Sequence, residues 1–197
     1  MNNYTIEKIE KCEYEIKKSR FIATIMPIKD LDDCKQKLQE IRKQYYDATH
    51  NCYSYVILDN NQLTIKNSDD GEPSKTAGVV IYDVLKKNEL VNVLCVITRY
   101  FGGIKLGANG LVRAYSKATS DVVNLIKKVK IENMASFSFT VSYQYVDECM
   151  KLMKEYKELS KEFNESALFN YLVPEEKINE LKDELIKITK NSVKYDN

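Results

Sequence analysis

The chain has 197 residues, 44% hydrophobic and 30% charged, a composition typical of a globular protein with one large or two small domains. Thirty basic and twenty-nine acidic side chains give a formal net charge of +1, which excludes the global positive charge that draws strongly basic proteins to polyanions. Any binding to nucleic acid must therefore come from a local patch.

The five cysteines are scattered, without a CxxC pair or a cluster that could complete a zinc site: Cys12, Cys34, Cys52, Cys95 and Cys149. This pattern predicts reduced thiols in a cytoplasmic protein. The first residues lack a long apolar region, and no run approaches the roughly 18 apolar residues of a membrane span. We therefore expect no membrane association, no metal and no other cofactor.

The first elements follow from apolar spacing. Alternation up to Pro27 predicts two strands joined near Lys18 and Ser19. A helix follows, with Asp30 as its N-cap and one apolar stripe at Leu31, Cys34, Leu38, Ile41 and Tyr45. Residues 52–58 are predicted to form a strand, and residues 63–65 a short partner across a turn at Asp59, Asn60 and Asn61.

The middle of the chain combines one ambiguous segment with two clear ones. Residues 77–85 have helical spacing, although the β-branched run at residues 79–81 suits a strand equally well. Residues 90–98 are almost all apolar and predict a strand buried on both faces. Beyond the glycines that follow, a second helix is defined by Leu111, Tyr115, Ala118, Val122, Leu125 and Ile126.

From Met134 onward glycine disappears and the spacing predicts the order βαββαβ, the split βαβ arrangement of ferredoxin-like domains. The final helix is expected to start at Pro174, which two glutamates follow. The predicted fold class is therefore α+β with two domains, an N-terminal two-layer domain over residues 1–133 and a ferredoxin-like domain over residues 134–197.

All six glycines fall between Gly71 and Gly110, and no Asp or Glu occurs from Leu90 to Ser120. A strand, a glycine-rich turn and a helix start direct unpaired N–H groups at the turn, which favours an anion. We therefore predict a site for a phosphate, a carboxylate or a nucleic-acid backbone, formed by Arg99, Gly102, Gly103, Lys105, Gly107, Asn109, Gly110, Arg113 and Lys117.

A structural interpretation has equal weight from spacing alone. The segment GGIKLGANG matches neither the dinucleotide GxGxxG nor the phosphate-loop GxxxxGK[ST] pattern. In this second interpretation the glycines shape a tight connection, and Arg99 and Arg113 pair with acids such as Asp69, Asp70 or Glu72.

The segment DDGEPSK and the single histidine supply the remaining candidates. The carboxylates could act as a general base or hold Mg²⁺, while Asp-Gly followed by Pro73 favours a turn. His50 could be an acid/base group or a hydrogen-bonded structural residue. Tyr100 and Phe101 could stack on bases or belong to the core. The candidate cleft residues are His50, Asp69, Asp70, Glu72, Ser74 and Lys75.

Four ordered segments, KKSRF, ATHNCYSYV, DDGEPSKTAG and RYFGGIKLGANGLVRAY, together resemble the IMPACT/YigZ family. The resemblance implies an N-terminal domain like the second domain of a small-subunit ribosomal protein. It implies a C-terminal domain like the fifth domain of elongation factor G. Lys75 departs from the family's usual GEPSGTAG, and residues 79–81 replace a proline-containing continuation.

The resemblance implies translational control, because eukaryotic members bind a protein activator of a stress kinase, and it carries over no catalytic residue. The first hypothesis is a cytoplasmic translation-associated protein that binds RNA or ribosomal components through its basic loop. The second is an enzyme acting on a phosphorylated or carboxylated small molecule with His50, Asp70 or Glu72. The third is a module that binds a translation factor or a kinase-regulating protein.

Overall fold

The structure is a computed structural model that describes residues 3–59 and 62–195. The chain divides into two compact units, Met1–Ile131 and Glu132–Asn197, where the sequence places the boundary after residue 133. Both units combine helices with antiparallel sheets, so the prediction of a two-domain α+β fold is confirmed.

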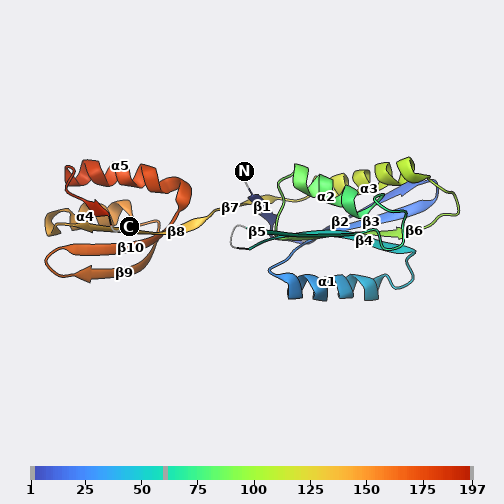
Figure 1. The fold of residues 1–197 in the computed structure, drawn as a ribbon, viewed down its shortest axis with the longest axis horizontal. Helices are drawn as coiled ribbons and strands as arrows, with labels where there is room; N and C mark the ends of the chain where they lie inside the picture. The colour runs from blue at the N-terminus through green and yellow to red at the C-terminus, as the bar shows by residue number, and fades with distance from the viewer. Residues whose placement is uncertain (1–2, 60–61, 196–197) are drawn as a thin grey trace. The chain divides into compact units, whose positions relative to one another are not determined.

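The N-terminal unit is built on a five-stranded antiparallel sheet (Figure 1). Its strands, in spatial order, are β2 (Glu10–Ile16), β3 (Ser19–Pro27), β6 (Val93–Tyr100), β4 (His50–Asp59) and β5 (Gln62–Ser68). Two further strands, β1 (Asn3–Ile6) and β7 (Lys128–Ile131), pair as a separate ribbon that the sequence did not predict. Of the predicted turn after β4, Asn60 and Asn61 lie outside the described residues.

Helices cover both faces of this sheet, so the unit has three layers where two were expected. Helix α1 (Leu31–Gln44) lies on one face, and α2 (Gly78–Lys87) and α3 (Ala108–Val123) lie on the other (Figure 1). The reason is the central strand β6, whose side chains alternate between the faces and are apolar on both. Leu94 and Val96 pack in the cluster with α1, whereas Cys95 and Ile97 pack in the cluster with α2 and α3.

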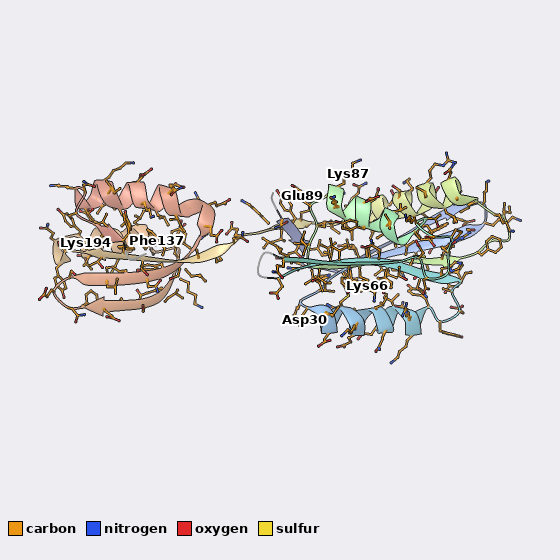
Figure 2. All side chains as sticks on the ribbon, viewed as in Figure 1. Asp30, Lys66, Lys87, Glu89, Phe137 and Lys194 are labelled. Atoms are coloured by element: carbon orange, nitrogen blue, oxygen red, sulfur yellow. The ribbon has the colours of Figure 1, made fainter. Side chains whose placement is uncertain are left out.

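The helix boundaries follow from local signals. Asp30, labelled in Figure 2, caps α1 by accepting hydrogen bonds from the backbone N–H groups of Asp32 and Asp33, as predicted. The ambiguous segment forms helix α2 and buries Val80, Ile81 and Leu85. Helix α3 ends at Val123, so the last predicted stripe positions lie beyond it, and Leu125 is exposed.

The C-terminal unit has the predicted βαββαβ order. Its elements are β8 (Met134–Val141), α4 (Val146–Leu152), β9 (Lys157–Phe163), β10 (Ala167–Pro174), α5 (Ile178–Thr189) and β11 (Lys194–Tyr195). The spatial order β11-β8-β10-β9 is that of a ferredoxin-like sheet, with every pair antiparallel. Pro174 ends β10, and a short 3₁₀ turn, Glu175–Lys177, precedes α5.

Aromatic side chains dominate the core of the C-terminal unit. Phe139 and Phe169 are fully buried with ring centres 5.5 Å apart, and Phe137, labelled in Figure 2, packs beside Phe139. None of the helices in residues 3–59 and 62–195 has the length and hydrophobicity that a bilayer-spanning helix needs.

Candidate functional site

A cleft of about 400 Å³ lies in the N-terminal unit where β4 begins, β6 ends and α3 starts. Strands β4 and β6 are antiparallel neighbours, and their register places His50 opposite Arg99. The lining includes His50, Glu72, Arg99, Phe101, Lys105 and Gly107. The basic loop and the histidine, predicted from separate segments, thus share one concave site.

Arg99 and Glu72 form a buried ion pair at the wall of this cleft. The distance from Arg99 Nη1 to Glu72 Oε1 is 2.5 Å, and the two side chains are 6% and 3% exposed. Arg99 Nη2 lies 3.4 Å from Ser19 Oγ. For Arg99, then, the structural interpretation of the basic loop is confirmed: the guanidinium is neutralised internally and is not a free surface cation.

A phenol and a thiol lie behind Glu72. Tyr115, on α3, donates its O–H to Glu72 Oε1 at 2.8 Å, and Cys52 Sγ lies 3.2 Å from the same phenol oxygen. Burial raises the pKa of both groups well above their ordinary values. Tyr115 and Cys52 therefore stay protonated, and the tyrosine remains a donor to the carboxylate.

His50 is held in one orientation by the backbone. Its Nδ1 lies 2.8 Å from the carbonyl oxygen of Asp70, and its Nε2 lies 3.8 Å from Glu72 Oε2. Because a carbonyl oxygen only accepts, Nδ1 carries the proton of the neutral ring. Nε2 faces the carboxylate of Glu72, so each ring nitrogen of His50 has an acceptor oxygen on its side.

The two aspartates of DDGEP have structural roles. Asp69 Oδ1 accepts hydrogen bonds from the N–H groups of Ala77 and Gly78, so it caps α2 from a distant position in the sequence. Its carbonyl accepts from Glu72 N, which confirms the predicted turn. Asp70 Oδ2 accepts from Asn51 N at 2.7 Å, and Oδ1 lies 3.4 Å from Arg42.

Four of the six cleft candidates lie outside the lining: Asp69, Asp70, Ser74 and Lys75. Lys75 has a φ of +63°, in the left-handed region that favours glycine. The chain therefore places a lysine in a strained backbone conformation at this position, where the family resemblance implies a glycine.

The predicted cations separate into two groups. Lys105 is exposed and lines the cleft, whereas Arg113 and Lys117 project, with Asn109, along the exposed face of α3 at four-residue spacing. Lys117 pairs with Asp121, 2.5 Å away. Among the described residues, neither Lys105 nor Arg113 has an ion-pair partner.

Two glycines matter for the backbone. A Cβ on Gly102 would lie 2.0 Å from the carbonyl of Lys18, so the loop after β6 approaches the turn before β3 in a way that only glycine permits. Gly107 has a φ of +73° and is the N-cap of α3, where no side chain caps the helix. Gly103 belongs to the same loop, and Gly110 lies in the first turn of α3.

The sequence did not point to several contributors to the site. Tyr115 fitted the apolar stripe of its helix, and Cys52 fitted a buried strand, so nothing in the pattern indicated their contact with Glu72. Phe101 was a candidate for stacking; it lines the cleft and is 45% exposed. In residues 3–59 and 62–195, no group of three or more His, Cys, Asp and Glu is arranged to hold a metal ion.

Fold and site together define a two-domain α+β protein with a charged cleft in its N-terminal unit and a ferredoxin-like C-terminal unit. The sequence profile of the Impact N-terminal domain matches residues 17–123. Since this match spans more than half of the chain, the protein belongs to the IMPACT family.

Full-length relatives agree with this assignment. The chain is 38% identical over 188 residues to the IMPACT family member YvyE of Bacillus subtilis, covering 94% of this chain and 86% of the relative. It is 27% identical over 184 residues to the family member YigZ of Escherichia coli, covering 91% and 89%. A crystal structure of a hypothetical protein superposes with a TM-score of 0.64 at 25% identity, over 98% of this chain and 96% of that one.

Proposed function

We propose that this protein acts in translation by binding RNA or a ribosomal component through the surface around the start of α3. The observation that carries the proposal is the pair of exposed cations Lys105 and Arg113, which have no ion-pair partner among the described residues. Lys105 precedes the N-terminus of α3, which has no side-chain cap, and Arg113 lies in the second turn of the helix; both belong to a stretch of 31 residues that contains no acid. Family membership adds the expectation of a role in translational control.

The RNA-binding surface in this proposal is smaller than the sequence predicted. Arg99 is neutralised by Glu72 and Lys117 is partly neutralised by Asp121, so Lys105 and Arg113 carry most of the local positive charge. Exposed cations contribute to RNA affinity by displacing counterions from phosphates, and this contribution weakens with salt.

The experiment is RNA binding by fluorescence anisotropy as a function of salt, with a short single-stranded RNA. Replacing Lys105 and Arg113 together with alanine is expected to reduce the slope of log K against log salt by about 1.4, at about 0.7 per lost phosphate contact. The matched control replaces Lys29 and Lys43, two exposed lysines beside and within α1 on the opposite face of the sheet, and should leave the slope unchanged.

Absence of RNA and ribosome association at low salt would contradict the proposal. Equal slopes for the two double variants would contradict the assigned surface. Stoichiometric capture of a single protein without RNA would favour the module that binds a translation factor or a kinase-regulating protein.

A second candidate function is acid–base chemistry on a phosphorylated small molecule in the cleft. The position of His50 favours it, because the ring lines the cleft with Nδ1 held by the carbonyl of Asp70 and Nε2 beside the carboxylate of Glu72, a histidine–carboxylate pair of the kind used in proton transfer. Turnover of p-nitrophenyl phosphate that is lost in His50→Gln would support this function. Turnover unaffected by His50→Gln and by Glu72→Gln would contradict it.

A further inference from the structure

Hydrogen-bond donors without acceptors gather at the cleft. Helix α3 has sixteen residues, and Gly107, its N-cap, has no side chain to cap it; the first backbone N–H that bonds in the helical pattern is that of Leu111, to Gly107 O. The preceding N–H groups, of Ala108 to Gly110, are therefore the positive end of the helix dipole. Gly107 and Ala108 both line the cleft.

A second, independent donor belongs to Arg99. Its two terminal nitrogens contact Glu72 and Ser19, but its Nε is buried and has no hydrogen-bond partner among the described residues. A buried donor without an acceptor is destabilising, because it has lost its hydrogen bonds to water. Because Arg99 lines the cleft, this unmet donor points to an acceptor atom supplied by a ligand.

The depth of the arginine restricts the kind of acceptor. Only 6% of its side chain is exposed, so a ligand atom must enter the cleft to approach it. An internal phosphodiester continues into a nucleotide on both sides and runs along a surface. A terminal phosphate has three oxygens and one attachment, so it can enter while the rest of the ligand stays outside.

The walls provide a surface for the rest of such a ligand. Phe101 is 45% exposed and lines the cleft, where its backbone N–H donates to Thr49 Oγ1 at 3.0 Å and its ring centre lies 5.4 Å from the guanidinium carbon of Arg99. Pro73 and Leu106 add apolar area, and Lys105 adds a positive charge. An aromatic ring beside an anion site matches a nucleotide, whose base stacks while its phosphate is held.

We propose that the cleft binds the terminal phosphate of a nucleotide, with the phosphate at the start of α3 and Lys105 and the base against Phe101. The inference rests on the proposed RNA-binding function, because it assigns the chain end as the part of the RNA that the cleft recognises. The same chemistry is present in a free nucleoside monophosphate, so the experiment includes both sources.

The experiment measures the affinity of the full chain for one RNA sequence in three forms: with a 5′-phosphate, with a 3′-phosphate and with hydroxyl groups at both ends. Free adenosine monophosphate is titrated in parallel by calorimetry. One phosphorylated form is expected to bind at least about tenfold more tightly than the hydroxyl form, and Lys105→Ala or Phe101→Ala should remove that difference. Ile104→Ala is the control, because Ile104 is 44% exposed in the same loop but does not line the cleft.

The outcomes separate the two proposals. Tight RNA binding that is the same for all three ends overturns the inference and leaves the proposed function standing. Binding of adenosine monophosphate that depends on Lys105 and Phe101, without binding of any RNA, supports the phosphate site and overturns the RNA function. If neither the RNAs nor adenosine monophosphate bind, both the phosphate site and the RNA-binding function are overturned.

Discussion

The two units differ in whether charged side chains are buried among their described residues. The C-terminal unit is packed with Phe137, Phe139 and Phe169, and among its described residues the buried polar one is Thr189, whose hydroxyl donates to Leu185 O in its own helix. The N-terminal unit has an equally apolar centre, but at the cleft it buries an ion pair, Arg99 and Glu72. Burial of an ion pair costs desolvation that apolar packing avoids, and the phosphate site that we propose lies beside this pair.

The largest expected effect comes from leaving Arg99 without its partner. Glu72→Gln should lower the free energy of unfolding by about 3–5 kcal/mol, because an uncompensated charge then remains buried. Urea denaturation followed by circular dichroism measures it. A loss below about 1 kcal/mol would show that Arg99 is solvated in solution, and the contrast between the cores would then fail.

The next effect tests the loop that forms the cleft. Gly102→Ala should destabilise the protein by about 1–3 kcal/mol, because the added Cβ would overlap the carbonyl of Lys18. Gly103→Ala is the matched control: it has a φ of +83° but no atom within 4 Å of the added Cβ, so about 1 kcal/mol is expected. Equal losses for the two variants would contradict the close approach.

Alkaline pH should affect both units in the same direction. Burial raises the pKa of Cys34, in the N-terminal unit, and of Cys149, in the C-terminal unit, from 9.0 to about 11. A raised pKa favours the protonated folded form, so stability is fully present below pH 9 and falls as the pH rises towards 11. Chemical denaturation across this pH range should show that the free energy of unfolding declines less steeply in Cys34→Ala and in Cys149→Ala than in the unmodified chain. The same decline in both variants and in the unmodified chain would contradict burial of the thiols.

The smallest expected effect is an increase in stability. Lys75→Gly should stabilise the N-terminal unit by up to about 1 kcal/mol, because φ at this position is +63° and glycine adopts it without strain. Lys75→Ala keeps a Cβ and should change little. Thermal unfolding of the two variants compares them, and a lower melting temperature for the glycine variant would contradict this explanation.

The sequence predicted the elements that have regular periodicity or clear caps, such as α1 with Asp30 and the βαββαβ tail. It assigned Tyr4 and Ile6 to one long first strand and did not separate β1 from β2, and it missed β7, because strands of four residues leave little pattern. It also gave two layers where there are three, since a strand that is apolar throughout does not show which element covers each face.

The site was predicted only in part, for a physical reason. Glycine and charge patterns indicated where the chain bends and where cations gather, and Lys105, Arg99, His50 and Glu72 do share a cleft. Whether Arg99 is paired depends on a contact with Glu72 across 27 residues, which spacing does not encode. Tyr115 and Cys52 contribute through long-range packing against Glu72 and gave no local signal.

The most direct test replaces the buried charges by apolar groups of similar size, with Glu72→Leu, Arg99→Met and Tyr115→Phe in one protein. We predict a free energy of unfolding within about 1 kcal/mol of the unmodified chain or above it, because buried ion pairs exchange for apolar packing at little cost. Binding of the RNA with a terminal phosphate should then fall to the level of the hydroxyl form. A stable triple variant that still prefers the phosphorylated RNA would contradict the claim that the buried pair serves the cleft.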